Sequence, residues 1–293
     1  MIDRAAMKRQ AQEINKGAKV NVYLFTLLFL AISLVLTTLD TLATGGEAQE
    51  FLDMYLDNGA SILGWSKGQS RLFLKNTLDR GFSAAFTNGT PANLNRALKQ
   101  LFAGFNVFKI YSCREDLQNA FEVYKDFCAK NGTPNAQAEN LTVWRPWQNF
   151  AASVIAENLN CFVFVLPFSW NGAQVFACKT DNPEELCALL PEDEPVNKPL
   201  EAAYCRSIYD LIAELPVRSA EQYAQYDEIL EKYWNRQGAY LLPKASADKY
   251  KDFFIYCLEN RVLISPYYEK PSIVPFGISA GSLTAIKNSS FQL

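Results

Sequence analysis

The sequence predicts an α+β or α/β protein in which an N-terminal transmembrane helix precedes one mixed helix/strand globular domain. The first observation behind this prediction is the run VYLFTLLFLAISLVLTTL, Val22 to Leu39, which holds no charged residue. The second is that helical and strand periodicities alternate along the rest of the chain without internal repeats. The third is the composition, because 49% hydrophobic and 20% charged residues are typical of a chain that builds a core.

We expect residues 20–39 to form the membrane helix. The uncharged run of 18 residues extends about 27 Å as a helix, close to the hydrocarbon thickness of a bilayer. It lacks the polar stripe of a surface helix. It is also longer than the apolar part of a cleaved signal peptide, which is usually about 7–15 residues. A buried helix of a soluble domain is the alternative interpretation.

Charge on either side of this run predicts its orientation. Residues 1–19 carry five basic and two acidic side chains. Between the run and Lys67, all the charged side chains are acidic. By the positive-inside rule we expect residues 1–19 to be cytoplasmic and the main domain to be extracytoplasmic. Gly45–Gly46 indicates a hinge, so residues 40–60 form a juxtamembrane linker and residues 61–293 the globular domain.

The opening segment DRAAMKRQAQEINKGAKVNVYLFTLLFLAISLVL resembles the start of an uncharacterised family of multi-pass bacterial membrane proteins. The resemblance covers roughly the first 45 residues and implies a membrane location. No later run reaches the length of a second span, so we expect a single-pass protein.

The first half of the domain begins with helical patterns. An amphipathic helix is predicted in WSKGQSRLFLKNTLDRG, and Thr90–Pro91 opens another. A strand is predicted in FNVFKIYS. Ser112 and Glu115 have the spacing of a capping box, which predicts the start of a helix that ends at Asn131–Gly132.

The second half alternates again. A helix is predicted in WQNFAASVIAENL, followed by two interior strands, CFVFVLPF and AQVFACKT, which Asn171–Gly172 joins as a hairpin. Three further helices are predicted in PLEAAYCRSIYDLIAEL, AEQYAQYDEILEKYW and SADKYKDFFIYCLEN. RVLIS and SIVPFG are short strands near the end.

Composition excludes several classes of chemistry. The chain has no histidine, which excludes Ser-His-Asp and Cys-His catalysis and zinc sites with imidazole ligands. No two cysteines form a CxxC pair, and the acidic run LPEDEP lacks EF-hand spacing, so we expect no metal and interpret that run as a solvated loop. Beyond residue 19 the balance is 23 basic to 29 acidic groups, which argues against a nucleic-acid partner.

The seven cysteines leave two interpretations open. Several lie on apolar helix faces, as buried reduced thiols do. An exported domain would instead favour at least one disulfide, with one cysteine left over.

The stretch VWRPW is the main candidate for a site. In the functional interpretation, Trp144, Arg145 and Trp147 are expected to form a stacking platform with a cationic clamp that suits a sugar ring, a peptide or an anionic ligand. The structural alternative is that Trp147 enters the following helix and Arg145 stacks on Trp144. We place a candidate ligand-binding site at these three residues together with Tyr267 and Tyr268.

The C-terminal passage YKDFFIYCLENRVLISPYYEKPSIVPFGIS, within residues 249–278, is similar to the small domain of class III aminotransferases. The resemblance implies a pyridoxal phosphate fold, in which a lysine forms a Schiff base and a loop cradles the phosphate. No glycine-rich phosphate loop is visible, and neither Lys244 nor Lys270 lies in a recognisable lysine motif. We therefore expect no cofactor.

These observations favour a membrane-anchored, non-enzymatic protein whose domain binds a partner or ligand outside the cytoplasm. Two alternatives remain open. One is an aminotransferase-like enzyme or a degenerate relative of one, and the other is a structural subunit of a membrane complex with a protein partner.

Overall fold

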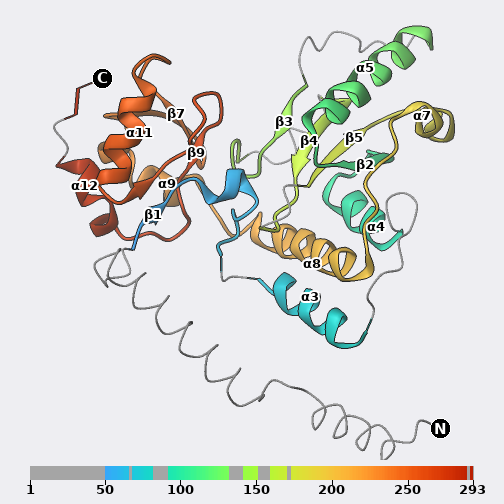
Figure 1. Cartoon of the computed structure of the whole chain (residues 1–293), viewed down its shortest axis with the longest axis horizontal. Coiled ribbons are helices and arrows are strands. Elements are labelled where there is room, and N and C mark those ends of the chain that lie inside the picture. The colour runs from blue at the N-terminus through green and yellow to red at the C-terminus, as the bar shows by residue number, and fades with distance from the viewer. Residues whose placement is uncertain are drawn as a thin grey trace, which may run out of the picture. The chain divides into compact units, whose positions relative to one another are not determined.

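A computed structural model describes residues 50–65, 68–81, 92–131, 141–150, 159–169, 173–288 and 291–292. The chain divides between Glu50 and Phe51, and the unit from Phe51 to Leu293 is compact (Figure 1). The predicted membrane helix at residues 20–39 lies outside the described residues. Among those described, no helix has the length and apolar character needed to cross a bilayer.

A four-stranded sheet in the order β2-β5-β4-β3 forms the centre of the first part of this unit. Its strands are β2 (Val107–Tyr111), β3 (Val143–Trp144), β4 (Cys161–Val165) and β5 (Gln174–Cys178). β4 and β5 are antiparallel, with Cys161 opposite Cys178, whereas β3 and β4 are parallel. The predicted strands in FNVFKIYS, CFVFVLPF and AQVFACKT are thus confirmed, while the predicted turn at Asn171–Gly172 lies outside the described residues.

Side chains that alternate along the strands give this sheet two buried faces, as expected of an interior sheet. One face packs against α5 (Arg114–Lys130) and α7 (Pro183–Leu189). The other packs against α4 (Ala92–Leu101) and α8 (Lys198–Glu214), as Figure 1 shows. α3 (Ser70–Asp79) packs in turn on α8.

Most of the helices predicted in this part form, with some corrections at their ends, but one is not seen in the described residues. α8 covers the predicted segment, and the Asn197 side chain caps it by accepting from Leu200 N at 3.0 Å. α5 begins one residue later than a Ser112 cap requires, because the Cys113 side chain caps it and Ser112 instead donates to Glu194. Of the helix predicted in WQNFAASVIAENL, residues 147–150 are not helical and residues 151–158 lie outside the description.

The rest of the unit is built on a three-stranded antiparallel sheet in the order β6-β7-β9. The strands are β6 (Trp234–Gln237), β7 (Tyr240–Pro243) and β9 (Ser272–Ile273), and β1 (Leu52–Asp53) pairs in parallel with β8 (Val262–Leu263). The helices are α9 (Ala220–Ala224), α10 (Asp227–Leu230), α11 (Tyr250–Glu259) and α12 (Thr284–Lys287), with short 3-10 turns η1 (Leu56–Gly59) and η2 (Ala280–Leu283).

One sequence prediction is corrected in this part of the chain, and one element was not predicted. The segment AEQYAQYDEILEKYW does not form one helix: it breaks into α9 and α10, and Trp234 begins β6. Tyr223, Tyr226, Leu230 and Tyr233 are all buried, so their packing decides the path of the chain over helix propensity. The hairpin of β6 and β7 was not predicted.

The acidic run from Leu190 to Pro195 is not a solvated loop. Asp193 is only 6% exposed and forms an ion pair with Lys109 of β2 at 3.3 Å. Glu194 N donates to the carbonyl oxygen of Ile110 at 2.9 Å, and Tyr111 donates to the carbonyl oxygen of Pro191 at 2.9 Å. The run therefore packs along the outer edge of β2.

All seven cysteines lie in the described residues, and all are free thiols.

Candidate functional site

A hollow of about 480 Å³ lies beside the carboxyl end of β3. Ligands of open α/β sheets bind outside the carboxyl ends of parallel strands, and β3 and β4 are the parallel pair of this sheet. The volume falls within the range of about 300–1,000 Å³ typical of small-molecule sites. The hollow is lined by Thr142, Val143, Trp144, Arg145, Gln148, Asn149, Leu159 and Gln237.

Arg145 is the charged group of this hollow. Its side chain is half-buried, and its guanidinium lies 5.9 Å from the centre of the Tyr240 ring. Burial lowers the pKa of Arg145, although the guanidinium still carries its proton at neutral pH. Among the described residues no carboxylate forms an ion pair with it. The hollow therefore contains a partly desolvated positive charge.

The backbone that carries Arg145 is held against the turn of the β6–β7 hairpin. Ala239 N donates to the carbonyl oxygen of Trp147 at 3.0 Å, and Gln148 Nε2 donates to Gln237 Oε1 at 3.1 Å. Trp147 itself has a left-handed backbone with φ of +59°, which a bulky residue seldom adopts. Strained backbone that persists is held by its surroundings, and it is often found at binding sites.

Trp147 is a core residue beneath the site and does not line the hollow. It is buried, and the guanidinium of Arg218 lies 4.1 Å from its ring centre. Arg218 is buried as well, with Glu214 as its ion-pair partner at 3.3 Å and the carbonyl oxygen of Ile62 accepting from it at 3.1 Å. Trp147 thus joins the VWRPW stretch to the core.

The five residues proposed from the sequence are distributed over different surroundings. Trp144 and Arg145 both line the hollow, and Trp144 packs edge-on against Phe102 and Phe164. Tyr267 and Tyr268 are exposed and do not line it. Tyr267 lies beside Lys270, and Tyr268 packs against Tyr250.

Sequence reasoning missed the amide side chains that surround Arg145. Gln148 and Asn149 follow the VWRPW stretch directly and were assigned to a helix instead. Gln237 arrives from the unpredicted hairpin, 89 residues further along the chain than Gln148. The sequence did contain a signal for this hairpin. Gln237–Gly238 lies between two segments rich in aromatic and aliphatic residues, and a glycine between two such segments indicates a turn.

Comparison with known proteins establishes the fold. No family model matches the chain. An uncharacterised protein of Treponema pallidum (strain Nichols) is 25% identical over 271 residues, which cover 76% of this chain and 82% of that protein, and the two are distant homologues. Acetylornithine aminotransferase from Elizabethkingia anophelis superposes with a TM-score of 0.53 at 11% identity, over 81% of this chain and 87% of that one.

An ornithine aminotransferase from Toxoplasma gondii superposes with a TM-score of 0.58 at 10% identity, over 82% of this chain and 85% of that one; its structure contains pyridoxal phosphate at partial occupancy. The chain is therefore a mixed α/β domain with structural similarity to the class III aminotransferase fold. Identity at this level shows the fold alone.

Pyridoxal phosphate requires a lysine for its Schiff base and an acidic or basic partner for its ring nitrogen. The carboxyl ends of β3 and β4 lead into Arg145–Trp147 and Leu166–Ser169, and neither segment contains a lysine, although Arg145 is a basic group. No lysine among the described residues is buried. Lys244 is exposed and donates to the carbonyl oxygen of Glu231, and Lys270 is exposed beside Tyr267.

The space at the end of β4 is also too small for this cofactor. A cavity of about 20 Å³, room for about one water molecule, lies there between Phe168 and the segment near Trp65. Ser169, which lines it, is hydrogen-bonded to Ser61 at 2.6 Å, and Phe168 packs on Tyr204. At the ends of β3 and β4, the described residues thus provide no lysine for a Schiff base with pyridoxal phosphate.

Proposed function

We propose that this chain is a non-catalytic binding protein built on the aminotransferase fold, and that it holds a small oxyanion at Arg145. The observation that carries the proposal is the half-buried guanidinium at the carboxyl end of β3, which has no carboxylate partner among the described residues. Removing a charge from water is costly unless an opposite charge compensates it. A bound phosphate or carboxylate supplies that charge, and its oxygens match the guanidinium fork.

The groups around Arg145 suit the same ligand. Gln148, Asn149 and Gln237 bring side-chain amides to the wall of the hollow, and Thr142 brings a hydroxyl. Trp144 adds an aromatic surface. The hollow is larger than one oxyanion requires, so we expect the anion to be part of a small organic molecule.

An active aminotransferase is the second candidate, since the fold favours it. The residues at the ends of β3 and β4 argue against it, because they offer no Schiff-base lysine. The likeness of residues 249–278 to the small aminotransferase domain then reflects a common architecture without the activity. A degenerate relative of the enzymes accounts for both the fold and the site.

We also propose that residues 20–39 anchor the domain in a membrane, with the N-terminus cytoplasmic and the domain outside. The uncharged run Val22–Leu39 and the five basic residues before it support this location. The resemblance of the first 45 residues to multi-pass membrane proteins supports it as well.

Thermal unfolding of the full chain in mild detergent tests the anion site. We expect inorganic phosphate to raise the midpoint of unfolding above the value in chloride at equal ionic strength, because a ligand of the native state stabilises it. Arg145→Met should abolish this increase. Without phosphate, Arg145→Met should be at least as stable as the wild type, since it removes a partly desolvated charge.

Arg114→Gln is the matched control, because Arg114 is exposed on α5 and does not line the hollow. It should respond to phosphate as the wild type does. An equal phosphate response in Arg145→Met and the wild type would overturn the proposal.

The absence of aminotransferase chemistry has its own test. The full chain is incubated with pyridoxal phosphate, reduced with borohydride and mapped by peptide mass spectrometry. We expect only scattered, substoichiometric labelling of exposed lysines. Stoichiometric labelling of a single lysine would favour the enzyme.

A further inference from the structure

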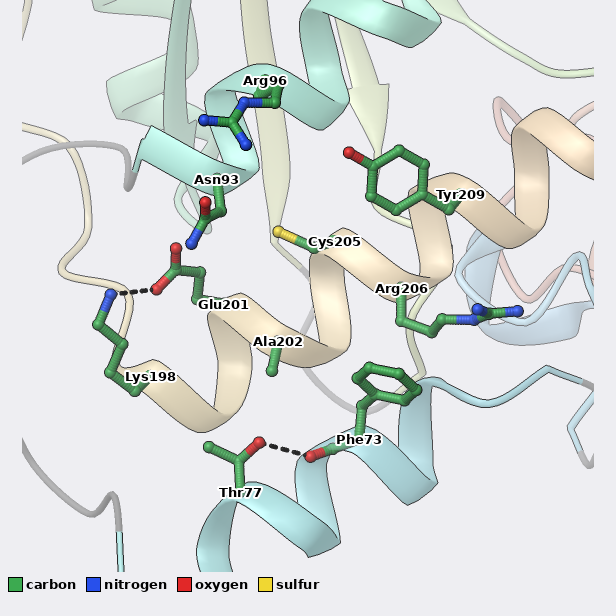
Figure 2. A pocket seen from close by; sticks show the side chains of 10 residues that line it. All are labelled: Phe73, Thr77, Asn93, Arg96, Lys198, Glu201, Ala202, Cys205, Arg206 and Tyr209. Carbon is green, nitrogen blue, oxygen red and sulfur yellow. Dashed lines mark hydrogen bonds and ion pairs between the residues drawn. The ribbon is translucent and has the colours of Figure 1, made fainter.

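A second hollow, independent of the Arg145 site, runs along α8 between α3 and α4 (Figure 2). Its volume is about 550 Å³, within the usual range for small ligands. Side chains of α8 form its floor, with those of α4 along one side and those of α3 along the other, as Figure 2 shows. α3 and α8 contribute both apolar and polar groups, whereas the two α4 residues that line the hollow, Asn93 and Arg96, are polar.

The floor contains a buried carboxylate, that of Glu201, in which only one of the two oxygens accepts a hydrogen bond from a described residue. Glu201 is 4% exposed, and its Oε2 accepts from Lys198 Nζ at 2.6 Å. Its Oε1 is buried and has no hydrogen-bond partner in the described part of the chain. A buried acceptor left without a donor costs free energy. A ligand with an N–H or O–H group at this point would supply the missing donor.

The side formed by α4 carries a positive charge. Arg96 is exposed at the hollow and forms no ion pair with any described residue, and Asn93 precedes it by one helical turn. The other arginine of the hollow, Arg206, is already paired with Asp210 at 2.6 Å. Arg96 is therefore the cation that can receive an anionic group.

The remaining surface is apolar. Phe73 of α3 is 41% exposed although it lines the hollow, and the exposed ring of Tyr209 stands at the end nearer the C-terminus of α8. The small side chains of Ala202 and Cys205 leave space on the floor of the hollow between Phe73 and Tyr209. An exposed aromatic pair over small side chains is a suitable surface for an apolar ligand body.

We propose that this hollow binds a small amphipathic anion that also carries a hydrogen-bond donor. The donor pairs with Glu201 Oε1, the anionic group with Arg96, and the apolar body lies between Phe73 and Tyr209. The donor and the anionic group of the ligand thus correspond to the unpartnered oxygen of Glu201 and to the unpaired charge of Arg96 in the described chain, and its apolar body corresponds to the exposed rings.

Three matched probes separate these contributions in calorimetric titrations of the full chain in mild detergent, with detergent alone as the blank. 3-Phenyllactate has the ring, the carboxylate and a hydroxyl donor. 3-Phenylpropionate lacks the donor, and 2-phenylethanol lacks the carboxylate. We expect 3-phenyllactate to bind best, and loss of either group to weaken binding about tenfold or more, because a hydrogen bond to a charged group is involved in each case.

Variants on the hollow assign the site. Arg96→Gln should weaken 3-phenyllactate binding about tenfold, whereas Lys99→Gln, an exposed substitution on the same helix away from the hollow, should leave it unchanged. Ala202→Trp should fill the floor and abolish binding, with thermal unfolding as the check that the variant folds. Equal affinity for the three probes, no binding by the wild type, or equal affinity in Arg96→Gln and Lys99→Gln would overturn the proposal.

Discussion

Gly238 and the carbonyl oxygen of Trp147 approach so closely that a Cβ atom on residue 238 would lie 1.8 Å from that oxygen. The neighbouring Gln148 oxygen would lie at 2.6 Å. Both are backbone atoms, so neither can rotate away. The β6–β7 turn and the stretch that carries Arg145 are therefore pressed together at a position that only glycine can occupy.

Gly238→Ala should thus be strongly destabilising. The substitution adds a clash with backbone to a left-handed conformation, φ +60°, that alanine rarely adopts. We expect a loss of about 3 kcal/mol or more in the free energy of unfolding, measured by urea denaturation. Gly277→Ala is the control, since Gly277 also has positive φ, +74°, but nothing lies within 4 Å of the added methyl. It should cost about 1 kcal/mol. Equal losses in the two variants would show that the close approach is unimportant.

Lys109→Met should destabilise the domain because it removes the ammonium from beside the buried carboxylate of Asp193. The pair has 15% and 2% of its side-chain surface exposed. Removing one partner of a buried pair costs about 3–5 kcal/mol. The double variant Lys109→Met/Asp193→Leu should recover much of this loss, as measured in a double-mutant cycle. Additive effects would indicate that the two charges do not interact.

Stability should fall in alkaline solution. Burial raises the pKa of Cys161 and that of Cys257 from 9.0 to about 12, so in the folded state these thiols keep their protons where the unfolded chain loses them. The contribution of these two thiols to the free energy of unfolding is complete below pH 9 and is lost as the pH rises from 9 toward 12. Each group contributes a slope of about 1.4 kcal/mol per pH unit within that window.

Urea denaturation between pH 8 and pH 11 measures this slope. Cys257→Ala should lower stability at pH 8 yet show a shallower decrease with pH, since one buried thiol is missing. An unchanged slope in this variant would contradict the assignment.

Cysteine labelling tests the proposed topology. Cys113 and Cys187 are exposed, whereas Cys128, Cys161, Cys178 and Cys257 are buried. If the domain lies outside the cytoplasm, a membrane-impermeant maleimide should label intact cells, and the variant Cys113→Ser/Cys187→Ser should lose most of that label. Labelling only after lysis would place the domain in the cytoplasm. Labelling only after reduction would contradict the free thiols of the structure.

Periodicity predicted the elements whose burial is local and regular. β4 and β5 are unbroken apolar runs because both faces of their sheet are covered, and α8 has its apolar stripe at helical spacing. The segment from Ala220 to Trp234 has a similar stripe yet breaks twice. Its aromatic residues pack into a core made by distant parts of the chain, which no local pattern reveals.

The same limit applies to the site. Trp144 and Arg145, which line the hollow, were proposed from the sequence because an aromatic residue beside an arginine is a local signal. Gln237 was not, because it reaches the hollow only through the contact of Gly238 with Trp147. Tyr267 and Tyr268 had the composition of a binding surface but belong to another region of the domain. A binding site assembled from separate segments depends on tertiary contacts that spacing does not encode.

The packing of Leu190–Pro195 along β2 has a consequence for the behaviour of the protein at high concentration. β2 is an outer strand of its sheet and is five residues long and rich in apolar side chains, and such an edge strand can pair with another chain when it is exposed. The acidic, proline-containing run occupies that edge with a backbone hydrogen bond to Ile110. At the opposite edge, β3 is only two residues long and ends near Pro146. Within the described sheet, the Leu190–Pro195 segment on one side and the short β3 on the other thus limit intermolecular strand addition, and we expect loosening of the Leu190–Pro195 segment to favour aggregation.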